Sequence, residues 1–523
     1  MTWDVAIIGS GFAGALLARL LAVQGRRVML IERDTHPRFA LGESSTPLAA
    51  LSLERLARRY RQPDLHHLAA YGRWQRHLAG LGHGLKRGFT FYRHRPRGVG
   101  DAGATCTDRM LVAASPDDEV ADCQWLRSDV DTHLVTQAIR TGVVYHDRTE
   151  IEEIEPSPDA VRLRGQRGQD RLEVRARFVV DASGAGEVVA RSLGVGSHPR
   201  QPRFSSRLVY AHFDGVTPLE DVMSRFGRPS PPGPYPDDWA AVHHLLDEGW
   251  IYGLRFRDGV VSAGLLADGG DHRSAIPEPR SAQTWWETVI GRYPALDAAW
   301  QGARARPPGV GMTPWLQRRR EYATGDRWAM LPQSFAFYDP MFSTGIAWSL
   351  LGVERLAQVL GTGGIDLARL ARYETLLQAE ADQQLALLEA AYTSRPDFPV
   401  FRNVTFLYFA CVSYAELRQR LVGDTRVGDA WRGFLGAEDP HWTTLFGQAR
   451  AQAAATLADG TESARRWFTQ WVSDGIRAHN LIGLGESDTQ LYGVDLDLLV
   501  QRSALLGLSA KELKARLGRL RGR

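Results

Sequence analysis

The glycines near the N-terminus have the spacing of a phosphate-binding turn. Gly9, Gly11 and Gly14 follow an apolar run, Val5 to Ile8, and open a helical pattern. Gly9 permits a tight turn, Gly11 lets the backbone approach a pyrophosphate, and Gly14 lets the helix lie close to the sheet. The free N–H groups and positive end of the helix would bind the pyrophosphate. These residues therefore predict the binding of a dinucleotide.

A carboxylate stands where such a site needs one. The helix, expected over Ala13 to Gln24, is followed by a second strand over Arg27 to Ile31, which Glu32 closes. At that position a carboxylate accepts hydrogen bonds from both hydroxyls of an adenosine ribose. The combination of strand, glycines, helix, strand and acid is a complete βαβ dinucleotide fingerprint, which a glycine-rich turn alone is not.

A second helix start has the residue types for binding an anion. Ser343, Thr344 and Gly345 precede an amphipathic helix expected over Ile346 to Leu360, and Asp339-Pro340 stiffens the turn before them. Hydroxyls and N–H groups at the positive end of a helix suit a negative charge, such as a halide ion. The alternative is that Ser343 and Thr344 only cap the helix.

Composition narrows the class of protein. The 523 residues are 44% apolar and 24% charged, with a net charge of +3, which is ordinary for a soluble globular protein and does not favour nucleic acid. Cys106, Cys123 and Cys411 lack metal-site or CxxC spacing, so we expect a reducing compartment. We read the basic end, Lys511 to Arg523, as a solvated helix or tail. With the first strand at the N-terminus and no long apolar run, we expect a cytoplasmic protein without stable membrane insertion.

The elements that position these residues indicate an α/β fold with several units. Residues 205–317 are strand-rich and lack intervening helices, so we expect an antiparallel sheet that walls a substrate cavity. We expect a discontinuous dinucleotide-binding domain over about 1–84, 110–200 and 320–365, combined with a substrate sheet over about 85–109 and 201–319. A helical C-terminal region would cover 366–523.

Three motifs in this order carry a family resemblance: Gly9 to Gly14 (GSGFAG), Asp181 to Gly184 (DASG) and Asp339 to Ile346 (DPMFSTGI). They resemble the FAD-binding, Rossmann-type domain of the glutathione reductase kind in the flavin monooxygenase superfamily. GESSTP at Gly42 to Pro47 and PMFSTGI at Pro340 to Ile346 further resemble the flavin-dependent halogenases, especially those acting on phenolic, pyrrolic or carrier-bound substrates. The resemblance covers about residues 1 to 360.

The resemblance implies a set of site residues. The halide would lie at Ser343, Thr344 and Gly345. Arg127 resembles the family's arginine beside the flavin, although a surface salt bridge to Asp131 is the alternative. The residues implied to bind FAD are Gly9, Gly11, Phe12, Ala13, Gly14, Glu32, Arg33, Ser44, Arg127, Asp181, Gln333, Asp339, Gly345 and Ile346.

The resemblance also implies that Lys86 is the catalytic residue. Its ammonium would hydrogen-bond hypohalous acid, or its amine would form a haloamine, to deliver halogen to an aromatic carbon away from the flavin. Residues Gly84 to His94 alternate in polarity, a pattern that only Arg87 interrupts, which predicts one strand. In that strand Lys86 faces away from Leu85 and Arg87, so the two cations cannot both face one cavity.

Three positions depart from the family pattern. Trp250-Ile-Tyr252 replaces a motif with two tryptophans, and Pro332-Gln333 replaces a Gly-Asp pair. Phe342 stands where halogenases of free tryptophan have a glutamate, which disfavours free tryptophan as substrate. The aromatic side chains of the C-terminal region are expected in the core, with some walling a cavity: Phe401, Phe406, Tyr408, Phe409, Tyr414, Trp431 and Phe434.

The function expected is halogenation of an electron-rich aromatic natural-product intermediate, free or carrier-bound, with FADH2, O2 and chloride or bromide. No second GxGxxG follows a strand, so a separate flavin reductase would supply the reduced flavin. One alternative is a flavin-dependent monooxygenase or oxidase, and another is a non-catalytic flavoprotein that binds a partner. We expect no metal, because the adjacent pairs His66-His67 and His243-His244 would diverge on a helix.

Overall fold

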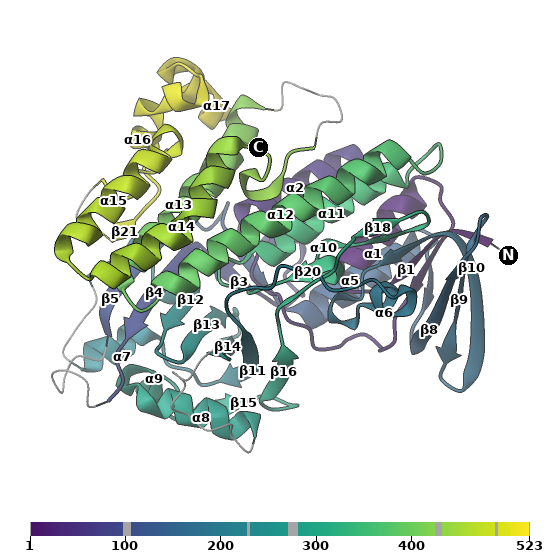
Figure 1. Ribbon diagram of the computed structural model, residues 1–523, viewed down its shortest axis with the longest axis horizontal. Coiled ribbons are helices and arrows are strands. Elements are labelled where there is room, and N and C mark those ends of the chain that lie inside the picture. The colour runs from purple at the N-terminus through teal and green to yellow at the C-terminus, as the bar shows by residue number, and fades with distance from the viewer. Residues whose placement is uncertain are drawn as a thin grey trace.

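The computed structural model describes residues 2–97, 106–226, 231–269, 281–423, 431–486 and 490–521. Two large sheets and a group of C-terminal helices make up this part of the chain (Figure 1). The predicted α/β architecture, with a parallel sheet, an antiparallel sheet and a helical C-terminal region, is confirmed.

The first sheet is parallel at its centre. β1 (Thr2–Ile8) lies between β2 (Val28–Ile31) and β10 (Asp170–Asp181), and all three run in the same direction. β2 and the last four residues of β1 and of β10 are buried, because helices and loops cover both faces of a parallel sheet. β7 (Val144–His146) pairs parallel with β2, and β19 (Trp328–Met330) pairs parallel with β10. β9 (Val161–Arg167) pairs antiparallel with β10 and with β8 (Thr149–Pro156), and β18 (Thr324–Gly325) pairs antiparallel with β19.

The second sheet is mainly antiparallel. In spatial order it contains β15 (Arg304–Ala305), β11 (Ser206–Asp214), β14 (Val261–Asp268), β13 (Gly249–Arg255), β12 (Ala241–Leu245), β4 (Gly88–His94), β5 (Cys106–Ala113) and β21 (Leu491–Tyr492), and β16 (Gly311–Trp315) also pairs with β11. Within this second sheet, the pairs β12–β4 and β21–β5 are the only parallel ones among the described residues. Short two-stranded pairs join β3 (His83–Lys86) to β6 (Asp122–Trp125) and β17 (Arg318–Arg319) to β20 (Ala336–Phe337).

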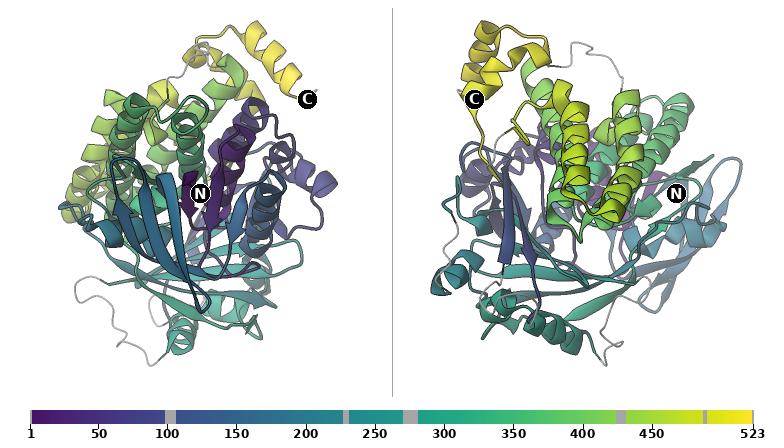
Figure 2. Two further views of the ribbon diagram at one scale, coloured as in Figure 1. Left: turned by 90° about the vertical axis from the view of Figure 1, so that its right-hand side faces the viewer. Right: turned by 60° about the vertical axis from the view of Figure 1, so that its left-hand side comes forward.

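Helices cover both sheets. α1 (Phe12–Val23) packs against β1, β2, α5 (Arg127–Arg140) and α11 (Thr344–Val359), and α2 (Pro47–Arg59) packs on α11. Figure 2 shows the antiparallel sheet as a layer between the C-terminal helices on one side and α8 and α9 on the other. The helices on the other side are α8 (Ala282–Arg292) and α9 (Pro294–Ala299). The C-terminal helices are α12 (Leu367–Ser394), α13 (Phe398–Leu417), α14 (Pro440–Asp459), α15 (Glu462–Ile476), α16 (Leu496–Gln501) and α17 (Ala510–Arg521). Short helices are α3 (Asp64–His67), α4 (Tyr71–His77), α6 (Val188–Leu193), α7 (Leu219–Arg225) and α10 (Pro332–Phe335).

Strand alternation gives the antiparallel sheet two apolar faces. On β13, Ile251 packs in the cluster that contains Trp285 and Trp286 of α8. Its neighbours Trp250 and Tyr252 belong to the large core on the other face, which continues into the parallel sheet and the C-terminal helices. Because successive strand residues point to opposite faces, this one strand supports α8 and also walls the interior.

The prediction of a single strand over residues 84–94 is wrong. Arg87 separates β3 from β4, and the two strands belong to different sheets. The N–H of Arg87 donates to the carbonyl oxygen of Trp239 at 2.6 Å, and a Cβ at Gly88 would lie 2.2 Å from the carbonyl oxygen of Val112. Arg87, the residue that interrupts the alternation, is therefore the point at which the chain passes from one sheet to the other. Lys86 and Arg87 nevertheless have separate partners, Ser45 and Asp118.

In the described part of the chain, no helix combines the length and apolar character needed to span a bilayer.

The Gly14 position tests the packing of α1 on the dinucleotide turn. A Cβ there would lie 2.0 Å from the carbonyl oxygen of Gly9 and 2.9 Å from Cβ of Ala182. We expect Gly14→Ala to lower the free energy of unfolding by about 1–3 kcal/mol through overpacking. Urea denaturation of the purified variant measures this.

Gly447 of α14 is the matched control, because a Cβ there meets nothing within 4 Å. We expect Gly447→Ala to raise stability by up to about 1 kcal/mol, since alanine favours a helix interior. Equal effects of the two substitutions would contradict the proposed close packing at Gly14.

Candidate functional site

A cavity of about 500 Å³ lies where the two sheets meet, and we call it the cofactor cavity. Its lining combines the glycine turn after β1, the end of β2, the N-terminus of α11 and residues of β12 and β13. Trp250, which the family motif shares, and Tyr252, which replaces its second tryptophan, wall this cavity, so the antiparallel sheet contributes to it as well as to the substrate side.

The glycine turn presents backbone rather than side chains to the cofactor cavity. Gly9 has φ +104° and packs against the turn after β10, where a Cβ would lie 2.4 Å from the carbonyl oxygen of Ala182. A Cβ at Gly11 would meet nothing closer than Arg127 Nη2 at 3.4 Å, so space lies in front of it. Gly9 therefore serves the turn, and Gly11 leaves room for a ligand.

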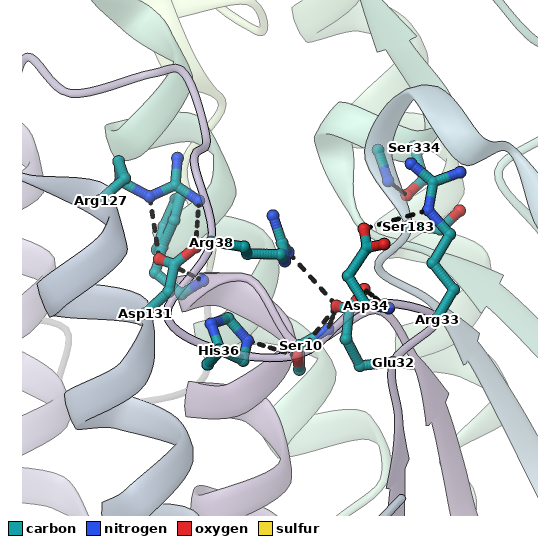
Figure 3. A network of polar contacts seen from close by, with 12 residues as sticks. Ser10, Glu32, Arg33, Asp34, His36, Arg38, Arg127, Asp131, Ser183 and Ser334 are labelled. Atoms are coloured by element: carbon teal, nitrogen blue, oxygen red, sulfur yellow. Dashed lines mark hydrogen bonds and ion pairs between the residues drawn. The ribbon is translucent and has the colours of Figure 1, made fainter. Parts of the chain in front are cut away.

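Glu32 closes β2 as an anion that is already oriented. Its carboxylate accepts hydrogen bonds from N and Oγ of Ser10, both at 2.9 Å, from N of Asp34 at 3.1 Å and from Arg38 at 3.3 Å (Figure 3). Burial alone would raise the pKa of Glu32, but the Arg38 guanidinium and the donors of Ser10 and Asp34 outweigh it and hold the pKa below its usual value. A charged carboxylate at this edge suits the hydroxyls of a ribose.

Arg127 is buried, so the alternative of a surface salt bridge is wrong. Its Nε and Nη2 each lie 2.9 Å from an oxygen of Asp131, and Nη1 donates to the carbonyl oxygen of Leu41 at 2.5 Å (Figure 3). Asp131 also accepts from N of Phe12, the first residue of α1, at 3.1 Å. The pair thus joins α5, α1 and the segment at Leu41 around the cofactor cavity.

Asp181 lies behind the cavity wall. Its carboxylate accepts from N of Ser183 at 2.8 Å, Oγ of Ser183 at 2.6 Å and N of Val189 at 2.8 Å, which ties the turn after β10 to itself. Ala182 and Ser183 line the cavity, and Asp181 does not. Asp181 therefore supports the turn, and the turn rather than Asp181 itself is expected to contact the cofactor.

The N-terminus of α11 opens into the cofactor cavity. Ser343 adopts φ 50° and forms no side-chain cap bond, so a purely capping role is not what the structure describes. The first N–H groups of a helix have no acceptor within it.

Two polar side chains lie beside this helix start. Nε2 of Gln333 lies 3.6 Å from the position that a Cβ would take at Gly345. Burial raises the pKa of Asp339 to about 7. Asp339 accepts from N of Met341 at 2.9 Å and from the Tyr392 hydroxyl at 2.6 Å.

The cofactor cavity fits FAD in the chemistry of its donors. Five buried polar atoms of residues that line it lack a hydrogen-bond partner within the described residues: Ser44 Oγ, Arg38 Nε, Trp250 Nε1, Arg318 Nε and Tyr338 Oη. Buried donors of this kind are rare unless a ligand satisfies them. Of the residues expected to bind FAD or halide, those that line the cavity are Gly9, Gly11, Phe12, Ala13, Gly14, Glu32, Arg33, Ser44, Arg127, Gln333, Asp339, Ser343, Thr344, Gly345 and Ile346.

Sequence reasoning missed Arg38 and Arg318. Arg318 donates to the carbonyl oxygen of Gln333 at 2.7 Å, and burial lowers its pKa to about 10. It stands in a run of three arginines, Arg318 to Arg320, and nothing in that run distinguishes the one that faces a cavity. Arg38 follows the second strand in a loop without a motif of its own.

A second cavity, of about 600 Å³, lies between α2, β4, β5 and the C-terminal helices. Its apolar side includes Phe89, Val112, Tyr408, Phe409 and Phe434, so part of the C-terminal aromatic cluster walls a cavity as expected. On its polar side, Glu54, Arg73, Glu416 and Arg420 form ion pairs with one another, and Arg55 pairs with Glu354 outside the lining.

Lys86 lies in the wall between the two cavities, with no exposed surface. Its Nζ donates to the carbonyl oxygen of Ser45 at 2.6 Å, between Ser44, which lines the cofactor cavity, and Thr46, which lines the second cavity. Nζ also lies 4.2 Å from the ring centroid of Phe89. Lys86 lines neither cavity itself, and from β3 its ammonium binds the segment that lies between them.

Phe342 closes the same region with an apolar side chain. Its ring stacks on that of Tyr408 with 4.7 Å between the ring centroids, and the Tyr408 hydroxyl donates to its carbonyl oxygen at 2.8 Å. The position that holds a glutamate in halogenases of free tryptophan is therefore packed into the aromatic wall of the second cavity.

The described residues contain no cluster of three His, Cys, Asp or Glu side chains arranged to hold a metal ion. His243 and His244 lie on β12 rather than on a helix. Neighbours on a strand point to opposite faces, so the pair still diverges. His243 lines the cofactor cavity, where burial lowers its pKa to about 4.

Comparison with known proteins agrees with this geometry. Residues 2–226 match the FAD binding domain family. The tetracycline 7-halogenase of Kitasatospora aureofaciens is 30% identical over 413 residues, which cover 77% of this chain and 72% of that protein. Monodechloroaminopyrrolnitrin halogenase PrnC of Pseudomonas fluorescens is 26% identical over 480 residues, 87% of this chain and 82% of that protein.

The crystal structure of halogenase PltM in complex with phloroglucinol and FAD has the same fold. It superposes with a TM-score of 0.82 at 21% identity and covers 94% of this chain and 100% of that one. The identity to the tetracycline halogenase, over more than two thirds of both chains, carries the assignment beyond the fold. The chain belongs to the flavin-dependent halogenase family, and it is an enzyme that binds FAD and halogenates aromatic substrates.

Proposed function

We propose that the protein halogenates an electron-rich, phenol-type aromatic in the second cavity, with Lys86 delivering the halogen. The observation that carries this proposal is the position of Lys86, buried between a cavity fitted to FAD and a cavity walled by aromatic rings. A reactive species formed on one side meets the lysine before it meets the substrate on the other.

The residue type supports a chemical role. Of the 63 lysine and arginine residues in the chain, only Lys86, Lys511 and Lys514 are lysines. A guanidinium stays protonated in proteins, whereas a lysine amine gains and loses a proton when its surroundings shift its pKa. The one lysine of the first 510 residues stands at the boundary of both cavities.

The halide is assigned to the N-terminus of α11. Ser343, Thr344 and Gly345 line the cofactor cavity, and the positive end of a helix of 16 residues favours an anion there. When bound, reduced FAD supplies the electrons with which dioxygen and halide become hypohalous acid and water.

The residues of this chain then control where the halogen goes. Lys86 has hydrogen-bond donors left after its bond to Ser45, and these hold the oxygen of hypohalous acid. The aromatic carbon attacks the halogen, the halogen–oxygen bond breaks, and Lys86 gives a proton to the departing oxygen to form water. The amine takes up the ring proton, which restores the ammonium.

The second cavity suits a flat, apolar substrate. Phe89, Tyr408 and Phe409 present ring faces and edges, and 600 Å³ is within the range of pockets for small organic molecules. Phe342 offers no carboxylate to hold an indole N–H. By their names the two relatives act on tetracycline and on monodechloroaminopyrrolnitrin, and PltM binds phloroglucinol, so an aromatic ring that is electron-rich is the chemistry that we take them to share.

Reduced flavin is proposed to come from a separate reductase, since the sequence has no second GxGxxG after a strand. Hydroxylation by a monooxygenase would require the substrate to reach the cofactor cavity. The wall of Lys86, Ser45 and Phe89 opposes this, and halide-independent oxygenation of a phenol panel would establish it instead.

Lys86→Met tests the proposal. The substitution keeps the length of the side chain and removes its donors. In a reaction with FAD, a flavin reductase, NADH, bromide and electron-rich phenols, we expect the brominated product to fall at least about a hundredfold, the lower range for loss of a proton-transfer group. Consumption of reduced flavin continues, and mass spectrometry measures the product.

Lys514→Met is the control, because that lysine is exposed on α17. It leaves bromination unchanged. Wild-type bromination by the Lys86→Met enzyme would contradict the role of Lys86, and a wild-type enzyme that gives the same product without bromide would contradict halogenation itself.

Val412→Trp tests the second cavity as the substrate site. Val412 lies on α13 and lines that cavity, so the larger side chain fills part of it. We expect KM for the phenol to rise roughly tenfold or more, as for other small changes in apolar pockets. Gln448→Trp on the exposed face of α14 is the control. FAD binding, followed by fluorescence, stays unchanged in both; an unchanged KM in Val412→Trp would place the substrate elsewhere.

A further inference from the structure

Asp122 lies directly opposite Lys86. β3 and β6 pair antiparallel, and the register joins Lys86 to Asp122 and Leu85 to Cys123. Directly opposite residues of an antiparallel pair project to the same face of the sheet. The backbone alone therefore places the Asp122 carboxylate beside the Lys86 side chain.

The course of the Lys86 side chain strengthens this placement. The segment at Glu43 to Ser45 lies along the other edge of β6, where N of Trp125 donates to the carbonyl oxygen of Glu43 at 2.6 Å. Because β6 separates this segment from β3, the lysine side chain crosses β6 to reach the carbonyl oxygen of Ser45. It passes over the strand that carries Asp122.

Both groups are buried and have hydrogen-bonding capacity to spare. Lys86 is 0% exposed and Asp122 is 5% exposed. The ammonium has one hydrogen bond, to Ser45, and no hydrogen bond reaches the Asp122 carboxylate from the residues that the structure describes. A buried lone charge is costly, so each group is the counter-charge that makes the other tolerable.

The surrounding charges come from two further elements. On the side of Lys86, the charge of the lysine acts on His243 of β12, whose low pKa keeps it neutral near pH 7. On the side of Asp122, Glu416 of α13 and Arg420, just after that helix, act on the carboxylate; they pair with each other at 2.6 Å, and Arg420 also pairs with Glu54 at 3.1 Å. Because these charges have partners of their own, Asp122 is the acidic group left to act on Lys86.

We propose that Asp122 is the positioning residue that keeps Lys86 charged and directed within the wall, and thereby sets the pH range of halogen delivery. The inference rests on the proposed role of Lys86. Asp122 touches neither reacting partner and acts through the lysine: each time the amine gives its proton to the departing oxygen and regains one from the ring, the carboxylate favours the return to the ammonium.

The direction of the effect follows from the two opposing influences on Lys86. Burial is the larger influence and lowers the pKa of Lys86, and the Asp122 carboxylate opposes it; Lys86 in turn opposes the rise that burial causes in the pKa of Asp122. Removing that carboxylate leaves burial unopposed, so the ammonium is lost at a lower pH than in the wild type. The alkaline limb of the kcat profile, which reports loss of the ammonium, then moves to lower pH.

Asp122→Asn provides the test, and the scarcity of lysine makes it direct. In protein labelled with an NMR isotope at lysine Cε, three signals arise, and those of Lys511 and Lys514 on exposed α17 serve as internal references. We expect the pH midpoint of the Lys86 signal to fall by roughly one to three pH units in Asp122→Asn, the usual effect of losing a nearby opposite charge.

Two variants control for general disturbance. Asp118→Asn removes the carboxylate that pairs with the neighbouring Arg87 at 2.6 Å, and we expect it to leave the Lys86 titration unchanged. Asp122→Glu keeps the carboxylate on a longer side chain. We expect the alkaline limb of the kcat profile to stay near the wild-type pH because the charge is kept, and kcat to fall because the charge is displaced. If Asp122→Asn does not fold, Asp122→Glu compared with Asp118→Asn still tests the role of the carboxylate.

A folded, FAD-binding Asp122→Asn with wild-type Lys86 titration and wild-type pH profile would overturn the inference. The outcome is distinguishable from failure of the proposed function. If Lys86→Met still brominates, the delivery role fails, whereas the NMR titration continues to report on the pair. If Lys86→Met is inactive and Asp122→Asn is unchanged in both readouts, only the role of Asp122 fails.

Discussion

A buried ammonium must be compensated where it lies, and the wall between the two cavities is arranged around that constraint. Lys86 has no exposed surface, one carbonyl acceptor at Ser45 and the Phe89 ring at 4.2 Å. Without these partners and a counter-charge on β6, an isolated ammonium would not remain charged in such a place. In the proposed function, the same seclusion would let a reactive halogen species meet the lysine in preference to water, so the stability of the wall and its chemistry would depend on the same contacts.

The cofactor cavity and the wall share their supports. Arg127 follows β6, binds Asp131 in a bidentate pair and holds the carbonyl oxygen of Leu41 at 2.5 Å, while Asp131 also accepts from N of Phe12 at the start of α1. The segment that carries Ser44 and Ser45 is thus tied to the dinucleotide turn through α5 and to Lys86 through the Ser45 carbonyl. A change in the shape of the cofactor cavity therefore reaches the lysine through one continuous set of contacts.

Local chemistry in the sequence predicts much of this arrangement. The glycine spacing, Glu32 and the helix start at Ser343 depend on short-range rules for turns and helix ends, and all three line one cavity. The interruption at Arg87 is visible in the alternation of polarity, but its division of the segment between two sheets was missed, because long-range contacts with Trp239 and Val112 decide it. Arg318 and Asp122 were missed for the same reason: each becomes a site candidate only through the residue that the fold brings opposite, Gln333 for one and Lys86 for the other.

The most direct test of the account is the fate of isotopically labelled dioxygen in the reductase-coupled reaction with bromide and an electron-rich phenol. If the halogen is made in the cofactor cavity and delivered through Lys86, the product gains bromine and no labelled oxygen, and the label appears in water. A product that carries labelled oxygen, formed equally well without bromide, would contradict the account, because the substrate would then react at the flavin and the wall between the cavities would have no role in delivery.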